Sequence, residues 1–292
     1  MKKCIFTGSG VAIVTPFTKD GIDYDKLGEL IDFQIREETD AIVICGTTGE
    51  ASTMPDDEHI AAIAYTAEKV NGRVPVIAGT GSNDTRHAIN LSKRAEEAGA
   101  DAILSVSPYY NKTTQRGLYE HFKVIAENIG IPVILYNVPS RTNLNINPDT
   151  IQKLSEIDNI VAIKECNLNQ VAEVMNLCGS DFTVYSGEDG LVVPLMSLGG
   201  KGVISVMANI IPRDTHDMAA KYLAGDIEGA RKLQLKVAEL VKALFIEVSP
   251  IPIKEAMNLL GMDVGKCRMP LVDMGEANKQ ILIRAMQNYG LI

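Results

Sequence analysis

One lysine interrupts an apolar run in a way that suggests chemistry. The stretch NIVAIKECN, residues 159–167, reads as a buried β-strand, because its β-branched and small residues suit a strand covered on both faces. An ammonium group is costly there. Burial can lower a lysine pKa by ~3–5 units, which would let Lys164 attack a carbonyl as a neutral amine. The alternative is a strand-end lysine that extends to solvent.

Three further groups could act with this lysine. Tyr136 ends a neighbouring strand-like run, and a phenol beside an amine can relay the protons that imine formation moves; alone, it also fits a core tyrosine. The loop GTTGE, residues 46–50, offers the hydroxyls of Thr47 and Thr48 to a small carboxylate, or is only a capped turn. Arg141 could hold a carboxylate through two hydrogen bonds, or be a solvated loop arginine.

These residues lie at the ends of short β-rich runs that recur eight times. Segments of helical period separate the runs, as in residues 24–39 and 85–100, and this alternation indicates parallel βαβ units. Eight units at spacings of roughly 20 to 32 residues fit a barrel better than an open sheet. The runs are residues 11–17, 41–46, 74–81, 102–108, 132–138, 160–165, 182–188 and 202–209.

The sequence therefore predicts an α/β fold, a (β/α)8 TIM barrel with a C-terminal helical region. Residues 1–223 would form the catalytic barrel domain, and residues 224–292 an appended region of three helix-like stretches without a strand. Chemistry in such a barrel lies at the C-terminal ends of the strands. The stretches GTTGE, SPYYN, YNVPSRT and KEC would meet at that rim.

Composition excludes several classes of partner. The formal net charge of -9, without a run of Lys and Arg, disfavours nucleic acid. No window approaches the ~20 apolar residues of a membrane span, and we read the N-terminal stretch as a strand rather than a signal peptide. Five cysteines, an odd number without a CxxC pair, indicate reduced thiols and a cytoplasmic location.

Neither a metal nor a nucleotide cofactor is expected. The four histidines show no HxxxH or HExxH spacing, so the sequence predicts no metal site. The glycine-rich residues 79–84 lack the third glycine of a dinucleotide fingerprint. Residues 199–205 lack the spacing of a P-loop and its hydroxyl after Lys201.

Several motifs together resemble one family. GTTGE, SPYYNKTTQRGLYEHF, ILYNVPSRT, IVAIKE, SGED and GGKGVISV are similar to the 4-hydroxy-tetrahydrodipicolinate synthase family, among the pyruvate-dependent class I aldolases, and the similarity covers essentially the whole chain. It implies a lyase of lysine and diaminopimelate biosynthesis that condenses pyruvate with L-aspartate 4-semialdehyde through a lysine Schiff base. No cofactor would be needed. It also implies a homotetramer built as a dimer of dimers.

The resemblance assigns catalytic roles. Lys164 would form the imine with pyruvate, and Tyr136 would give and take protons beside it. Thr47 or Thr48 would link Tyr136 to Tyr110, which in this family reaches in from a neighbouring subunit. Thr48 would also contact the substrate.

The resemblance also assigns substrate contacts and leaves alternatives. Arg141 would bind the carboxylate of the semialdehyde, and backbone groups near Gly187 and Ile204 would line the pyruvate site. The alternative is N-acetylneuraminate lyase or a related sugar-acid aldolase, although the lyase usually carries serine then threonine in the loop and lacks this arginine. A lysine-responsive binding protein without activity is disfavoured, because every catalytic residue is present.

Many members of the family bind L-lysine in a cleft between subunits. The residues that match this cleft are His59, Asn83 and Tyr109. Asp56 stands where lysine-sensitive bacterial relatives have histidine, His87 where they have glutamate, and Ala51 replaces a serine. His87 removes a carboxylate that would pair with the ammonium group of the ligand. Weak or absent inhibition by L-lysine is the resulting hypothesis.

Overall fold

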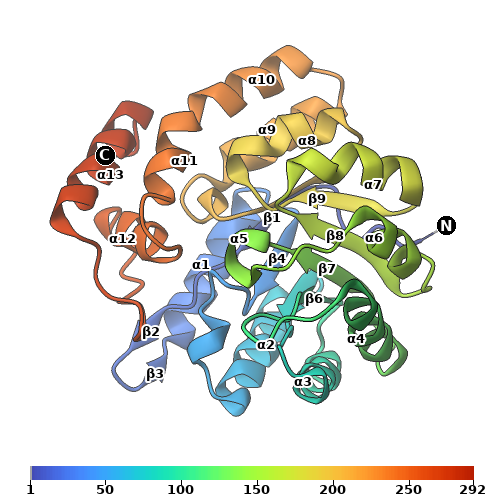
Figure 1. Ribbon diagram of the computed structural model, residues 1–292. Coiled ribbons are helices and arrows are strands. Elements are labelled where there is room, and N and C mark those ends of the chain that lie inside the picture. The colour runs from blue at the N-terminus through green and yellow to red at the C-terminus, as the bar shows by residue number, and fades with distance from the viewer. Residues whose placement is uncertain (1) are drawn as a thin grey trace.

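The computed structural model describes residues 2–292 and shows a closed barrel of parallel strands surrounded by helices (Figure 1). Neighbouring strands follow the order β1-β10-β9-β8-β7-β6-β5-β4 and back to β1. This confirms the predicted TIM barrel. The strands are β1 (Gly8–Ala12), β4 (Ala41–Ile44), β5 (Val76–Gly79), β6 (Ala102–Val106), β7 (Val133–Asn137), β8 (Ile160–Glu165), β9 (Thr183–Ser186) and β10 (Gly202–Ser205).

The first predicted strand is wrong in its position. Residues 11–17 were expected to be extended, but β1 starts at Gly8 and a small antiparallel hairpin follows it, β2 (Phe17–Thr18) and β3 (Gly21–Ile22). Gly8 pairs with Gly202, where an added Cβ would lie 1.9 Å from the Gly8 carbonyl oxygen. The two strands can approach this closely only because glycine occupies that position.

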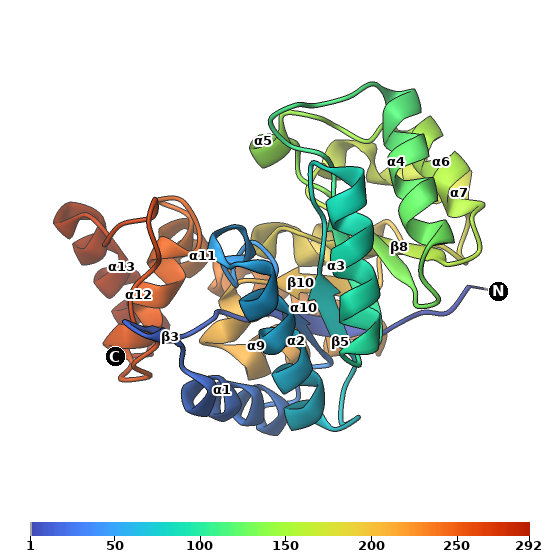
Figure 2. The ribbon, with the colours of Figure 1, turned by 90° about the horizontal axis from the view of Figure 1, so that it is seen from below.

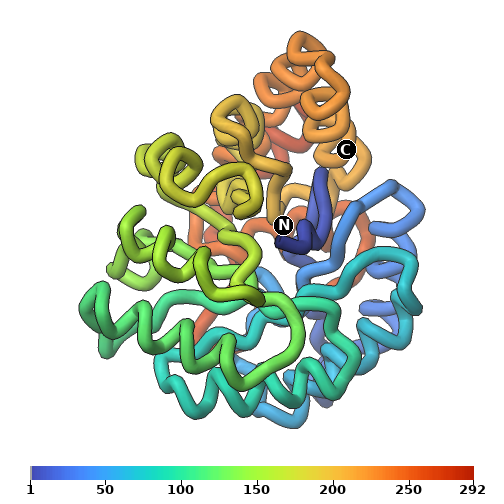
Figure 3. The backbone as a smooth tube through the Cα atoms, turned by 90° about the vertical axis from the view of Figure 1, so that its right-hand side faces the viewer, coloured from blue at the N-terminus to red at the C-terminus, as the bar shows by residue number. Residues whose placement is uncertain are grey.

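The barrel interior is a packed core rather than a pore. Its small and branched side chains include Ala12, Val43, Ile77, Leu104, Ile134, Ala162 and Ile204. The N-terminal segment adds Phe6, whose ring stacks on Tyr185 with 4.3 Å between centroids. Figure 3 faces the side of the molecule where the chain begins, with this segment near the centre and helices around it.

Helices cover the outside of the barrel. Several begin where a side chain caps the first turn, as Asp84 accepts hydrogen bonds from the N–H groups of Arg86 and His87. Leu27, Leu30 and Ile31 form a buried apolar face, as their spacing predicts. The helices are α1 (Tyr24–Arg36), α2 (Asp56–Val70), α3 (Thr85–Glu97), α4 (Gln115–Glu127), α5 (Pro139–Thr142), α6 (Pro148–Ser155), α7 (Val171–Cys178), α8 (Val192–Ser197) and α9 (Pro212–Leu223).

Helices alone follow α9 in the C-terminal region: α10 (Ile227–Lys236), α11 (Ala238–Leu244), α12 (Ile251–Leu259) and α13 (Glu276–Tyr289). The expectation of three helical stretches was wrong, because the first stretch breaks at Val237. Its two halves pack on different neighbours, α10 on α9 and α11 on α13. In Figure 2 α11, α12 and α13 gather at one side, beside β3. The division into domains at residue 223 stays a prediction.

In residues 2–292 no helix combines the length and the apolar character needed to cross a bilayer.

Candidate active site

Lys164 and Tyr136 face each other across neighbouring strands. They are direct partners in the parallel register of β7 and β8, near the C-terminal ends of both strands. Lys164 Nζ lies 4.5 Å from the centroid of the Tyr136 ring. Both residues are buried, with 5% of Lys164 and 7% of Tyr136 exposed. The structure therefore brings the amine and the phenol together, as the matching ends of the two apolar runs predict.

Burial changes the protonation of both groups. Removal from water lowers the pKa of Lys164, although Cys166, Asp189 and Glu188 oppose this shift. A neutral amine is therefore more accessible here than in a solvated lysine. Burial also raises the pKa of Tyr136, with an opposing contribution from the Thr47 side chain, so the phenol is protonated at neutral pH.

A cavity of about 290 Å³ opens at this end of the barrel. The predicted site residues that line it are Thr47, Thr48, Tyr136, Arg141, Lys164 and Gly187. They follow or end β4, β7, β8 and β9, as expected where the βα loops of a TIM barrel meet. Helix α5, which contains Arg141, lies over the middle of the barrel in Figure 1.

Arg141 is held in place from the C-terminal region. Its Nη2 donates a hydrogen bond of 3.1 Å to the carbonyl oxygen of Ser249. A guanidinium carries five N–H donors, so this contact orients the group and leaves donors for an anion. The arrangement suits a site for a small carboxylate beside an amine nucleophile.

Two predicted residues lie elsewhere. Tyr110 follows β6 on a loop, with 93% of its surface exposed and a left-handed backbone (φ 68°). Of the described residues 2–292, those that line the cavity do not include Tyr110. Ile204 is fully buried in β10 among the interior side chains, whereas Val206, two residues further, reaches the cavity.

The sequence analysis gave no role to two residues of the cavity wall, Cys166 and Glu188. Both belong to stretches that it had quoted, KEC and SGED. Burial raises the pKa of the Cys166 thiol to about 12, so it is not a reactive thiolate. The segment between α11 and α12 adds Phe245, Glu247, Val248 and Ser249. Nothing in the local sequence indicates that this segment returns to the barrel.

Glu247 fixes that segment to the last helix. Its Oε1 accepts hydrogen bonds from the N–H of Gly275 at 2.9 Å and from Nδ2 of Asn278 at 2.8 Å. The segment between α11 and α12 that lines the cavity is therefore hydrogen-bonded to the start of α13.

A second cavity of about 470 Å³ adjoins the first. The predicted cleft residues that line it are Ala51, Asp56, His59, His87 and Tyr109. Asn83 lies beside them, because its Nδ2 donates to the Tyr109 carbonyl oxygen at 3.1 Å. His87 Nε2 lies 2.9 Å from Oδ1 of Asp56. The residues that line both cavities are Gly46, Thr47, Leu104, Tyr136, Val138 and Arg141.

Among residues 2–292 no group of three or more His, Cys, Asp or Glu side chains could hold a metal ion.

Comparison with known proteins places this geometry in a family. The sequence model described as "Dihydrodipicolinate synthetase family" matches residues 5–289. The chain belongs to this family. A dihydrodipicolinate synthetase relative, 4-hydroxy-tetrahydrodipicolinate synthase of Acetivibrio thermocellus, is 70% identical over 292 residues and covers 100% of both chains.

Solved structures of dihydrodipicolinate synthases have the same fold as this chain. The crystal structure of dihydrodipicolinate synthase from Aquifex aeolicus is 47% identical with a TM-score of 0.96, and covers 98% of this chain and 99% of that one. The synthase from Acinetobacter baumannii, solved as a complex with pyruvate, is 44% identical with a TM-score of 0.95, and covers 98% of this chain and 99% of that one.

Proposed function

We propose that this protein joins pyruvate to L-aspartate 4-semialdehyde through an imine on Lys164, giving 4-hydroxy-2,3,4,5-tetrahydrodipicolinate at the start of the diaminopimelate route to lysine. The observation that carries the proposal is the buried amine of Lys164 opposite the Tyr136 phenol, in a cavity with Arg141 at its wall. Membership of the family and the names of the close relatives support it.

The reaction starts with the amine. Neutral Lys164 attacks C2 of pyruvate, and Tyr136 donates a proton to the departing oxygen, which leaves as water. The imine draws electrons from the methyl group, which loses a proton to give the enamine. The enamine carbon attacks the aldehyde carbon of the second substrate. The amine of that substrate then replaces Lys164 at C2, closing the ring and freeing the enzyme.

Electrostatic contacts orient both substrates. Thr48 is buried beside the cavity, and its hydroxyl can donate to the pyruvate carboxylate, while backbone groups near Gly187 line the pyruvate site. Arg141 would take the carboxylate of the semialdehyde, because Ser249 already fixes its direction. Ile204 lies below this surface and contributes packing.

A borohydride trap tests the proposal. The protein is incubated with pyruvate and borohydride, and the mass increase is located by peptide mapping. We expect one pyruvate-derived adduct on Lys164. No adduct, or one on Lys201 or Lys254, would refute the mechanism. Turnover of aspartate semialdehyde compared with N-acetylmannosamine then distinguishes the synthase from the sugar-acid lyase.

We propose a homotetramer, built as a dimer of dimers, in which Tyr110 acts in the cavity of a neighbouring copy. The support is its exposure and its place outside the cavity of its own chain. Tyr110→Phe should lower turnover, and a stable monomer should be nearly inactive. A fully active monomer would contradict this role.

A cytoplasmic location is also proposed, supported by the five free cysteines.

Inhibition by L-lysine is proposed to be weak or absent. The observation is the contact between His87 and Asp56 in the second cavity, where a carboxylate for the ligand ammonium would be needed at position 87. Initial rates are measured against L-lysine for the wild type and for His87→Glu. Half-inhibition of the wild type at low micromolar L-lysine would refute the hypothesis.

A further inference from the structure

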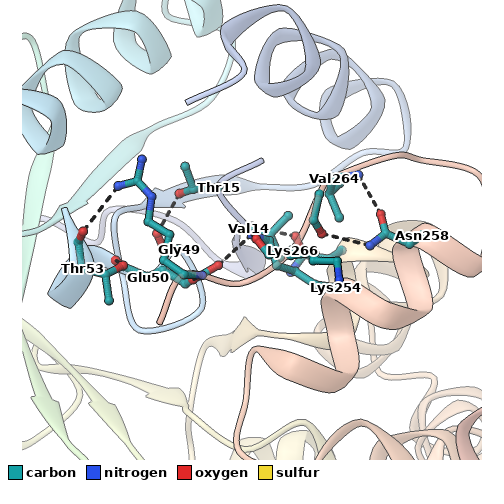
Figure 4. Close-up of polar contacts among 12 residues, drawn as sticks. Val14, Thr15, Gly49, Glu50, Thr53, Lys254, Asn258, Val264 and Lys266 are labelled. Atoms are coloured by element: carbon teal, nitrogen blue, oxygen red, sulfur yellow. Dashed lines mark hydrogen bonds and ion pairs between the residues drawn. The ribbon is translucent and has the colours of Figure 1, made fainter. Parts of the chain in front are cut away.

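The turn that carries Thr47 and Thr48 ends at a buried ion pair that no proposed step uses. Nζ of Lys254, in α12, lies 2.7 Å from Oε1 of Glu50, and the exposed fractions of the two side chains are 2% and 1%. Figure 4 shows the pair where the turn meets α12. Burial lowers the pKa of Lys254, and Glu50 opposes that shift. A pair this deeply buried is stable only when its geometry and its further hydrogen bonds are good.

Both partners have such additional contacts. Oε2 of Glu50 accepts a hydrogen bond of 2.8 Å from the backbone N–H of Arg268. Lys254 Nζ also donates to the carbonyl oxygen of Lys266 at 3.1 Å and lies 4.5 Å from the centroid of the Phe17 ring. Each oxygen of the Glu50 carboxylate is thus held by a donor from the C-terminal region, which fixes its position and direction.

The backbone of the turn needs such support. Glu50 has a left-handed backbone (φ 57°), a conformation that costs ~1–2 kcal/mol for a residue other than glycine. Its N–H donates to the Thr47 carbonyl oxygen at 3.1 Å. On the barrel side, Thr15 Oγ1 donates to the Gly49 carbonyl oxygen at 2.7 Å. The turn is therefore held from the barrel at Gly49 and from the C-terminal region at Glu50.

We propose that Glu50 and Lys254 are positioning residues, whose ion pair holds residues 46–50 so that the two threonine hydroxyls face the cavity beside Tyr136. The inference rests on the proposed function, since it assigns this turn to proton relay and substrate binding. The C-terminal region would then shape the active site at two places, through the cavity-lining segment between α11 and α12 and through its contacts with this turn.

The first test is Lys254→Met, which keeps the length of the side chain and removes its charge. Turnover at saturating substrates should fall at least tenfold, and trapping of pyruvate on Lys164 should slow by a similar factor while still reaching one adduct per chain. Lys164 is on β8, outside the turn, so the nucleophile itself stays in place. The matched control is Lys279→Met, because Lys279 pairs with Glu255 at 2.6 Å between α13 and α12, away from the turn.

A double variant separates positioning from stability. Lys254→Met leaves Glu50 as a buried charge and should lower the melting temperature. Glu50→Gln with Lys254→Met removes both charges, and replacing a buried pair by neutral groups is often tolerated. We expect the double variant to melt near the wild type but to keep turnover at least fivefold lower, because the tether from α12 is absent.

Two results would overturn the inference: turnover of the double variant within twofold of the wild type, or an equal loss in Lys279→Met. Failure of the proposed function gives a different result, since the wild type would then carry no adduct on Lys164.

Discussion

Replacing Lys164 by methionine should remove the chemistry and make the protein more stable. Methionine is unbranched and of similar length, so it can occupy the same space without the amine. Lys164 is almost completely buried, and burial lowers its pKa, which means that folding disfavours its charged form. The ring of Tyr136 offers only partial compensation, at 4.5 Å from Nζ.

The size of the gain follows from these contacts. A polar group that is desolvated without full pairing costs ~1–3 kcal/mol. A cation above an aromatic ring returns ~0.5–2 kcal/mol. The difference gives a stabilisation of about 1 kcal/mol for Lys164→Met. In a large domain this corresponds to a rise in melting temperature of about 2–4 °C.

Calorimetry with and without pyruvate is the assay. The variant should melt above the wild type in buffer and gain nothing from pyruvate, whereas the wild type should gain stability from a ligand that binds only its folded state. The unfolded chain has the higher lysine pKa. The free-energy cost that Lys164→Met removes is therefore largest below the pKa of Lys164 in the folded protein. This cost shrinks as the pH rises toward 10.5.

A lower melting temperature in Lys164→Met would refute this account of the buried amine. A pyruvate adduct on another lysine of the variant would refute the assignment of the nucleophile. Lys201→Met serves as the control, and it should neither gain stability nor lose the adduct.

Three further predictions concern the frame of the site and its pH dependence. Gly79→Ala would place a Cβ 2.2 Å from the Cys45 carbonyl oxygen, at the base of the threonine turn, so urea unfolding should show a loss of ~1–3 kcal/mol together with reduced turnover; an unchanged midpoint would contradict it. Phe122→Ala empties a fully buried position in α4 and should cost ~3–5 kcal/mol by the same measurement, with turnover of the folded fraction unchanged. The rate of pyruvate trapping on Lys164 should rise with pH and level off below pH 10.5, because only the neutral amine reacts; a rate that still climbs steeply through pH 10.5 would argue against a lowered pKa.

Regular elements were the most predictable part of the fold. Residues 160–165 form β8 as expected, because a run of β-branched residues suits a strand covered on both faces. The apolar period of α1 likewise predicted its buried face. The break at Val237 could not be predicted, because it depends on which neighbours the two halves of the stretch contact. The displaced start of β1 depends on the close approach of two strands at glycine.

The candidate site was predictable where residues follow strands. Lys164 and Tyr136 were expected to meet because parallel neighbours end at one rim, and their register agrees. Glu247 and Ser249 were not found, because they reach the cavity through long-range folding rather than through a local pattern. The partners of Glu50 have the same origin, since a buried ion pair leaves no spacing signal in the sequence.

The ion pair between Glu50 and Lys254 also has a consequence for biosynthesis. The two residues are 204 positions apart, and a ribosome adding ~5–20 residues per second needs about 10–40 s to cover that distance. During this time the Glu50 carboxylate cannot form its contact with Lys254. The threonine turn is therefore made early but can complete its contacts with the C-terminal region only after α12 has been made.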